Sequence, residues 1–370
     1  MFISSVEQSE LQLPHEQVVV RHDAASGLSA VIALHNTQLG PAAGGCRRWS
    51  YVSTDAAVED ALRLSEGMTF KNALAGIPFG GGKSVIIARP GEDAPTSEQL
   101  AVFGQWLNEL AGRYITAEDV GMGVAQMQEL ARHTKFAAGT GHRGVGGDPS
   151  PKTAYGVFVG IKSAIEYGLN RASVNGLHIS VQGLGAVGMA LCALLHQAGA
   201  RLTVADIEPC RVALAKQRFG ATGVDVKDIN KVAADVFAPC ALGGVINEAV
   251  AHEIDVSVIA GAANNQLLHN HCGDILAGRG ITYAPDFVIN AAGVISVGQE
   301  CLMRNNYFQQ ADTLSLQRWA ESRIQGIAYR LTRIFDMASA KGCSTDTAAK
   351  RLALSVLAQG DAQRGETVAA

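Results

Sequence analysis

Residues 178–206, with the sequence HISVQGLGAVGMALCALLHQAGARLTVAD, carry the clearest structural pattern in the chain. The β-branched run at 178–181 predicts a strand, a glycine-rich turn follows, and 189–198 has the apolar spacing of a helix. Residues 201–205 predict the next strand, which ends at Asp206. A strand, a helix and a second strand in this order predict a parallel sheet with helices on both faces, which is a doubly wound α/β fold.

The turn in this segment indicates a dinucleotide site. Gly183, Gly185 and Gly188 have the spacing Gly-x-Gly-x-x-Gly, which allows a tight turn, close approach of a pyrophosphate and close packing of helix on strand. The pattern alone is weak, but here a strand precedes it, a helix follows, and a carboxylate ends the next strand. Asp206 would accept hydrogen bonds from the adenosine ribose and repel a 2′-phosphate, which favours NAD over NADP.

The alternation of strands and helices continues on both sides of this segment. After it, further strands are expected at 235–238, 256–260 and 281–284. Before it, the patterns predict strands at 17–20, 29–34 and 84–87 and helices at 54–68 and 97–111. Residues 311–357 are expected to be wholly helical.

The chain has 370 residues, more than one hydrophobic core usually supports, so two domains with a cleft between them are expected. The glycine- and proline-rich segment 139–151 predicts a loop and a hinge, followed by a helix at 153–167. We therefore expect an N-terminal domain at 1–150 and a Rossmann-type NAD-binding domain at 151–330. The helices from about 330 to 370 are expected to pack back on the N-terminal domain.

The composition favours small molecules as ligands. A net charge of -4 gives no electrostatic reason to expect nucleic acid or a membrane surface as a partner. The seven cysteines include no Cys-x-x-Cys pair, so neither a disulfide framework nor a thiolate zinc site is expected. No apolar run approaches the ~20 residues that span a bilayer, and residues 1–10 do not resemble a signal peptide, so a cytoplasmic location is expected.

Two lysines in the first half of the chain are candidates for catalysis. Lys71 lies in the string GMTFKN and Lys83 in GGGKS, where no neighbouring charge suggests an exposed face. Burial would lower the pKa of a lysine towards neutrality, as a general base requires. Asp119, which follows a short apolar run in YITAED, is a third candidate.

Two other motifs carry weaker hypotheses. The string around Lys83 is similar to a phosphate-binding loop, but the first glycine of that motif would fall at Ile77 and a strand, not a helix, follows the lysine. Residues 269–272, with the sequence HNHC, could suggest a metal cluster. No fourth ligand has a suitable spacing, so surface residues at a helix start are favoured and no metal is expected.

Nine strings occur in the order and at the separations of one known family. The chain resembles the glutamate/leucine/phenylalanine/valine dehydrogenases over nearly its whole length, and most closely their leucine and phenylalanine branch. The strings are LGPAAGG, GMTFKNA, PFGGGKSVI, GRYITAEDVG, DPSPKTAYGV, VQGLGAVG, FAPCALGGVIN, IAGAANNQL and YAPDFVINAAGVISV.

The resemblance implies an NAD-dependent enzyme that converts an L-amino acid to its 2-oxo acid and ammonia. Lys83 looks like the catalytic lysine that activates water, Lys71 like the cation that holds the α-carboxylate, and Asp119 like the acid that moves protons to the amino group. A neutral Lys83 is what repulsion from a cationic Lys71 would produce. The resemblance also implies an N-terminal domain for substrate binding and oligomerisation, and a homo-oligomer.

Further site residues follow from matching positions of the family. The expected substrate-binding residues, besides Lys71, are Ala43, Gly44, Ala117, Asn264, Asn290, Val294 and Val297. The expected cofactor-binding residues, besides the three glycines of the turn and Asp206, are Thr153, Leu184, Ala186, Val187, Ile207, Cys240, Ala241 and Asn264.

The substrate is expected to be apolar. Glutamate-specific members of the family carry a lysine and a serine where this chain has Ala43 and Val297. Without either group a second carboxylate would be buried unpaired, at a cost of several kcal/mol. Val294 and Val297 favour leucine, valine or isoleucine, whereas the small Ala43 is typical of the phenylalanine branch and keeps an aromatic substrate as the alternative.

Two other classes stay open. A non-catalytic NAD-binding regulator would bind the cofactor without turnover, and the presence of Lys71, Lys83 and Asp119 argues against it. A 2-hydroxy acid dehydrogenase would rely on a histidine base beside a carboxylate and on an arginine clamp, and the sequence suggests no such pairing.

Overall fold

The computed structural model describes residues 15–141, 148–304 and 313–368. The chain forms two compact units, which we describe separately. Unit 1 contains the residues up to Asp148, the segment Val294–Ala320 and the chain from Ala353 onward, and unit 2 contains Pro149–Gly293 and Glu321–Leu352. The domain boundaries expected from the sequence, 1–150 and 151–330, stay predictions, because compact units and family domains need not coincide.

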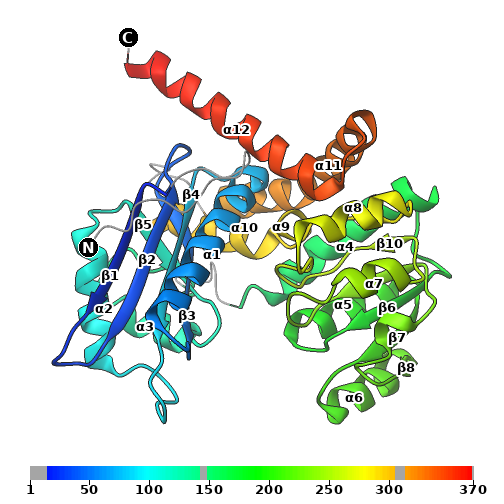
Figure 1. Ribbon diagram of the computed structural model, residues 1–370, viewed down its shortest axis with the longest axis horizontal. Helices are drawn as coiled ribbons and strands as arrows, with labels where there is room; N and C mark the ends of the chain where they lie inside the picture. The colour runs from blue at the N-terminus through cyan, green and yellow to red at the C-terminus, as the bar shows by residue number, and fades with distance from the viewer. Residues whose placement is uncertain (1–14, 142–147, 305–312, 369–370) are drawn as a thin grey trace. The chain divides into compact units, whose positions relative to one another are not determined.

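Unit 1 contains a five-stranded mixed sheet with the order β1-β2-β4-β3-β5 (Figure 1). Strands β1, β2 and β4 pair antiparallel, and β3 pairs parallel with both β4 and β5. The strands are β1 (Gln17–His22), β2 (Ser29–Asn36), β3 (Ala42–Trp49), β4 (Gly80–Ile87) and β5 (Tyr114–Ala117). Strand β4 therefore lies inside the sheet, where its side chains are buried.

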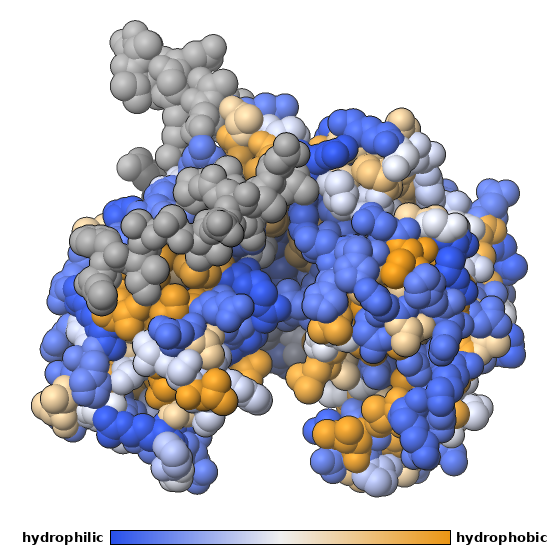
Figure 2. Space-filling view, viewed as in Figure 1, coloured by the Kyte–Doolittle hydropathy of each residue, from blue (hydrophilic) through white to orange (hydrophobic). Residues whose placement is uncertain are grey.

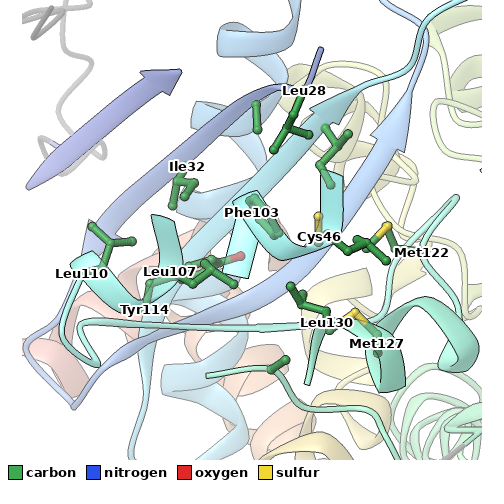
Figure 3. Close-up of a cluster of buried hydrophobic side chains, with 14 of the residues drawn as sticks. Leu28, Ile32, Cys46, Phe103, Leu107, Leu110, Tyr114, Met122, Met127 and Leu130 are labelled. Carbon is green, nitrogen blue, oxygen red and sulfur yellow. The ribbon is translucent and has the colours of Figure 1, made fainter. Parts of the chain in front are cut away.

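Helices cover both faces of this sheet. Along β2, Ile32 and Leu34 belong to a core with α2 (Ser97–Glu109) and α3 (Val124–Leu130), part of which Figure 3 shows. The alternate residues Val31 and Ala33 pack with α1 (Thr54–Ala75) on the other face. Every second side chain of a strand points to the same face, so a three-layer arrangement follows from the apolar character of β2 on both sides.

Helix α1 is longer than the sequence pattern predicts. It was expected at 54–68 but continues to Ala75, and it ends at Gly76, whose φ of 65° is left-handed. Ser53 begins the helix by accepting a hydrogen bond from the Ala56 amide. Glycine is the usual residue at such a left-handed helix end, so Gly76 marks the boundary better than the apolar spacing does.

Unit 2 contains a six-stranded parallel sheet with the order β11-β10-β9-β6-β7-β8 (Figure 1). The strands are β6 (His178–Gln182), β7 (Arg201–Ala205), β8 (Thr222–Gly223), β9 (Val236–Pro239), β10 (Val258–Ile259) and β11 (Thr282–Tyr283). The chain leaves β6 first towards β7 and later returns to β9 on its other side. This confirms the doubly wound fold, and ligands of such folds bind at the carboxyl ends of the strands where the order reverses.

Helices again cover both faces of the parallel sheet. On one face, Phe237, Ile259 and Tyr283 share a core with Cys272 and Leu276. The helices of the unit between Pro149 and Gly293 are α4 (Ser150–Leu169), α5 (Ala186–Gln197), α6 (Pro209–Phe219), α7 (Glu248–Glu253), α8 (Asn270–Gly278) and α9 (Asp286–Ile289). His269 occupies the N-cap position of α8, so the HNHC string lies at a helix start, as expected, but Cys272 is buried and not on the surface.

The C-terminal part of the chain forms three helices, α10 (Ala292–Arg304), α11 (Thr313–Lys341) and α12 (Thr345–Val368). The expectation that residues 311–357 are wholly helical is wrong at 342–344, because Gly342 adopts a left-handed φ of 59° and ends α11. The Ser344 hydroxyl then donates a hydrogen bond to the Thr347 hydroxyl oxygen and accepts one from the Thr347 amide at the start of α12. Of the expected hinge loop 139–151, residues 142–147 lie outside the described residues, and α4 begins at Ser150.

The visible surface in Figure 2 is mostly hydrophilic, with apolar side chains in separate small patches. Among the helices of the described residues, none has the length and apolarity needed to cross a membrane. Within the same residues, no group of three or more His, Cys, Asp or Glu side chains could hold a metal ion.

Candidate active site

The site in unit 1 centres on Lys83, which lies in β4 and is 6% exposed. Its ammonium group forms an ion pair with the carboxylate of Asp119, just beyond the end of β5. Both strands border β3, so the sheet itself brings the two side chains together. Two residues that the sequence analysis selected independently are thus direct partners.

The glycine pair in β3 makes this approach possible. A β-carbon at residue 45 would lie 2.8 Å from the β-carbon of Asp119 and 2.6 Å from the carbonyl oxygen of Glu118. A β-carbon at residue 44 would lie 1.9 Å from the carbonyl oxygen of Gly82. Real side chains do not come so close, so Gly44 and Gly45 let the Asp119 segment and β4 pack directly against β3.

Asp119 keeps its negative charge in this setting. Burial raises the pKa of its carboxyl group, but the charges of Lys83 and then Arg47 lower it by more, and the net pKa is below the usual value. Arg47 Nε lies 3.4 Å from Asp119 Oδ2, at ion-pair separation. The same oxygen faces the Lys83 ammonium group, and the Val120 amide also donates a hydrogen bond to the carboxylate. The carboxylate is therefore charged and held from several sides.

Arg47 is a site residue that the sequence analysis missed. A signal was present, because an arginine two positions after the glycine pair stands in a strand whose preceding residues are all small and buried. A charge at such a position needs a partner. The string GGCRRW contains two arginines, and the sequence does not show which one points to the site.

The expected substrate residues of unit 1 lie on neighbouring elements. Ala43 and Gly44 belong to β3, and the register pairs Gly45 with Ala117 at the end of β5. Lys71 is partly buried in α1, three residues after Met68, whose side chain lies beside Gly44. Residues three apart share a helix face, so Lys71 follows Met68 on the face that packs near β3. Val294 and Val297 are partly buried in α10.

In unit 2 the three glycines of the turn have different surroundings. A β-carbon at residue 183 would lie 2.8 Å from that of Ala241, and one at residue 188 would lie 2.0 Å from the Gly183 carbonyl oxygen. At Gly185 a β-carbon would meet nothing within 4 Å. Gly183 and Gly188 are thus required by packing, whereas Gly185 borders open space, which fits a pyrophosphate lying against the turn.

Asp206 lies at the end of β7 and fixes the turn. One carboxylate oxygen accepts a hydrogen bond from the Leu184 amide at 2.5 Å, and the other accepts one from the Glu208 amide at 2.8 Å. A guanidinium nitrogen of Arg211 lies 3.5 Å from the second oxygen. Beside it, the Ile207 side chain is exposed. Ala186 and Val187 form the first turn of α5, where free amides point towards the glycine turn.

The remaining cofactor residues lie at the same edge of the sheet. Cys240 and Ala241 directly follow β9, and the Cys240 amide donates to the Gln182 carbonyl oxygen at 2.7 Å. Burial raises the pKa of the Cys240 thiol to about 12, so this thiol is neutral. Thr153 is in the first turn of α4 and donates its hydroxyl to the Pro149 carbonyl oxygen at 2.9 Å. A neutral thiol and a hydroxyl that already has an acceptor are suited to contact a cofactor and not to act as catalytic groups.

Asn264 and Asn290 are direct partners. The side-chain amide of Asn290 donates to Asn264 Oδ1 at 2.8 Å and to the Ala262 carbonyl oxygen at 3.1 Å. Its own Oδ1 is buried and has no hydrogen-bond partner among the residues that the structure describes. A buried amide oxygen without a partner is costly, so it indicates a place where a ligand donates a hydrogen bond.

The order of the parallel strands and the glycine turn define unit 2 as a dinucleotide-binding fold, and unit 1 adds a buried lysine paired with a carboxylate. Together these features define a dinucleotide-dependent enzyme. More particularly, the chain belongs to the glutamate/leucine/phenylalanine/valine dehydrogenase family. Residues 14–136 match the Glu/Leu/Phe/Val dehydrogenase dimerisation domain, and residues 209–365 match the Glutamate/Leucine/Phenylalanine/Valine dehydrogenase domain.

Individual relatives span most of the chain. It is 45% identical over 340 residues to the leucine dehydrogenase of Geobacillus stearothermophilus, which covers 92% of this chain and 89% of the relative. It is 43% identical over 289 residues to the phenylalanine dehydrogenase of Thermoactinomyces intermedius, covering 77% and 79%. The crystal structure of L-tryptophan dehydrogenase from Nostoc punctiforme superposes with a TM-score of 0.79 at 39% identity, covering 94% and 96%.

These comparisons confirm the predicted family, the fold class and the prediction of an amino acid dehydrogenase. Membership of this family implies a nicotinamide dinucleotide cofactor and small-molecule substrates. The match to a dimerisation domain also indicates that the chain assembles into an oligomer.

Proposed function

We propose that the protein catalyses the NAD-dependent oxidative deamination of an apolar L-amino acid, with leucine, valine and isoleucine favoured, to the 2-oxo acid and ammonia. The observation that carries the proposal is the buried ion pair between Lys83 and Asp119 in a member of this family. Such a pair places two groups that can transfer protons next to each other, one for the attacking water and one for the substrate nitrogen. We also propose that the active form is a homo-oligomer.

In this proposal Lys71 binds the α-carboxylate of the amino acid, and Lys83 and Asp119 carry the proton transfers. NAD, when bound, would supply the acceptor for the hydride of the α-carbon, whose loss converts the amine to an iminium group. Lys83 acts in this step as a neutral amine, after release of its ammonium proton, and takes a proton from the water molecule that attacks the iminium carbon. Asp119 exchanges protons with the nitrogen as the carbinolamine collapses, and its lowered pKa keeps it available as an acceptor near neutral pH.

Two features support NAD as the cofactor. The space at Gly185 fits a pyrophosphate, and the carboxylate of Asp206 would accept hydrogen bonds from the ribose hydroxyls and repel a 2′-phosphate. Arg211 lies next to this carboxylate and offsets part of its negative charge. The preference for NAD would therefore depend on the negative charge that Asp206 still presents to a 2′-phosphate. The side-chain oxygen of Asn290 would accept a hydrogen bond, either from the substrate or from the amide group of the nicotinamide.

The substrate pocket we propose is lined by Ala43, Ala117, Val294 and Val297, which offer neither a cation nor a hydroxyl. A γ-carboxylate placed there would be unpaired, so glutamate should be rejected. The second candidate is an aromatic amino acid, favoured by the small side chain of the buried Ala43. The relatives include both leucine and phenylalanine dehydrogenases, which supports testing both substrate types.

The test measures NADH formation with leucine, valine, isoleucine, phenylalanine, tryptophan and glutamate. Lys83→Ala should lower the turnover of the best substrate by about a thousandfold or more, whereas NAD binding, followed by fluorescence, should be retained. The matched control is Lys135→Ala at an exposed lysine of the same unit. Unchanged turnover in Lys83→Ala, or oxidation of none of these amino acids by the unmodified protein, would refute the proposal.

A further inference from the structure

The carboxylate of Asp119 has a second cationic neighbour besides Lys83. Arg47 Nε lies 3.4 Å from Asp119 Oδ2, while Arg47 Nη1 lies 2.9 Å from Asp60 Oδ2. The guanidinium group therefore bridges two carboxylates, one beside the lysine and one on α1. The side chains of Arg47, Asp60 and Asp119 are 20%, 13% and 18% exposed, so solvent screens these interactions only weakly.

Asp60 is itself held in place from other sides. The Tyr51 hydroxyl donates a hydrogen bond to Asp60 Oδ2 at 2.6 Å, and Arg63 donates to Asp60 Oδ1 at 3.0 Å. Burial raises the pKa of Asp60, but the Tyr51 hydrogen bond and the charge of Arg47 outweigh it, and the net pKa is lowered. Asp60 is thus an ionised anchor that fixes one edge of the Arg47 guanidinium.

We propose that Arg47, anchored by Asp60, is a positioning residue for the dehydrogenase reaction, and that it orients the Asp119 carboxylate towards Lys83. The inference rests on the proposed function of the Lys83–Asp119 pair. Asp119 Oδ2 faces both Lys83 and Arg47, so the orientation of this oxygen depends on the two cations. With Arg47 removed, Lys83 and the Val120 amide would hold the carboxylate, which could rotate away from the reacting nitrogen.

The alternative is that Arg47 only ties β3 to α1 and contributes to stability. The two roles differ in their effect on Asp119. The groups that face Asp119 from the described elements are Lys83 of β4, Arg47 and Cys46 of β3, and Tyr114 of β5. Burial raises the pKa of the Cys46 thiol to about 12 and also raises that of the Tyr114 hydroxyl, so both are neutral. Lys83, Arg47 and the Val120 amide lower the pKa of Asp119, so loss of Arg47 should raise this pKa. A purely structural role of Arg47 predicts a loss of stability without a matching loss of kcat.

The experiment compares Arg47→Met, Arg47→Lys and Asp60→Asn with the unmodified protein. Arg47→Met should lower kcat about 10- to 100-fold while KM changes less than about threefold, because orientation and not binding is lost. The acidic limb of the pH profile of kcat should move to higher pH, since a cation that lowers the pKa of Asp119 is gone. Arg47→Lys should recover part of kcat, and Asp60→Asn, which removes the anchor of the guanidinium group, should lower kcat by less than Arg47→Met does.

The matched control is Arg21→Met, which removes an arginine that pairs with Glu109 on the surface of the same unit. A pH profile of Arg47→Met that coincides with that of the unmodified protein would overturn the proposal. So would an equal loss of kcat in Arg21→Met. Carboxyl NMR titration of Asp119 in each variant reports the same effect without turnover. A raised pKa of Asp119 in Arg47→Met would support the contact between the two residues. If the unmodified protein also oxidised no amino acid, the contact would stand while the proposed function would be refuted.

Discussion

The backbone of Gly183 and the α-carbon of Gly188 pack so closely that a β-carbon at residue 188 would lie 2.0 Å from the Gly183 carbonyl oxygen. Gly185, between them, borders open space in the same turn. The three glycines of one sequence motif therefore have two separate physical roles. Gly183 and Gly188 permit close packing within the turn, and Gly185 leaves space beside the turn for a ligand.

Substitutions can separate these roles. Gly188→Ala should lower the melting temperature by several degrees, because helix α5 must move away from β6 to accommodate the methyl group. Gly185→Ala should leave the melting temperature nearly unchanged but weaken NAD binding about tenfold or more, because its methyl group fills the space of the pyrophosphate. Thermal unfolding and NAD titration by calorimetry check both. Equal effects of the two substitutions on stability would contradict this division.

Cofactor preference should depend on Asp206. In Asp206→Ser the charge that repels a 2′-phosphate is gone, a hydroxyl remains to accept the Leu184 amide, and Arg211 is available to a phosphate. The ratio of kcat/KM for NADP to that for NAD should rise about 10- to 100-fold. Adding Arg211→Met should remove most of the gain. A ratio that stays constant in Asp206→Ser would show that this carboxylate does not select the cofactor.

The size of residue 43 should tune the choice between aliphatic and aromatic substrates. Ala43 is 8% exposed in β3, and the longer side chain of Ala43→Leu would occupy volume on the substrate side. The kcat/KM for phenylalanine and tryptophan should fall about tenfold or more relative to that for leucine. The KM for NAD serves as the internal control and should stay constant. An unchanged ratio of aromatic to aliphatic kcat/KM would place the side-chain pocket elsewhere.

Stability should depend on pH through Glu118. Burial, with the nearby charges of Asp148 and Glu300, raises the pKa of Glu118 from its ordinary value of 4.5 to about 7. The folded protein then binds a proton that the unfolded chain has lost, so this group's contribution is fully favourable below pH ~4.5 and is lost as pH rises through ~7. Because the side chain is partly exposed, the loss should be of order 1 kcal/mol.

Glu118→Gln removes this dependence, because the glutamine stays neutral. Relative to the unmodified protein, the variant should be more stable at pH 8 than at pH 5, as measured by urea unfolding at both values. The matched control is Glu109→Gln, on the exposed surface of α2. A stability difference that is independent of pH would contradict the assignment of this titration to Glu118.

The second unit was predictable in detail because its elements alternate with clear turns. The strand at 201–205 has the predicted bounds, and the helix after the glycine turn differs by a few residues at its start. Strand β3 escaped prediction, since its sequence AAGGCRRW lacks the β-branched residues that usually mark strands. Tertiary packing decides this strand, because its glycines allow β4 and the Asp119 segment to approach.

The candidate site was predictable as residue types and motifs but not as contacts. The sequence selected Lys83 and Asp119 separately, and only the register of β3, β4 and β5 makes them an ion pair. The role of Arg47 depends on a contact with Asp60 across two elements, which no spacing along the chain reveals. The expectation of an uncharged Lys83 stays a prediction.

Unit 1 is not a continuous piece of the polypeptide. The buried Glu300 of α10 accepts hydrogen bonds from the amides of Gly139 and Thr140, and the Thr140 hydroxyl completes the set. During synthesis on a ribosome, the first 148 residues would emerge long before the segments 294–320 and 353–370 that belong with them. All five strands of the N-terminal sheet are then synthesised, but the unit lacks these two later segments until the end of translation, so vectorial domain-by-domain folding cannot finish this unit first.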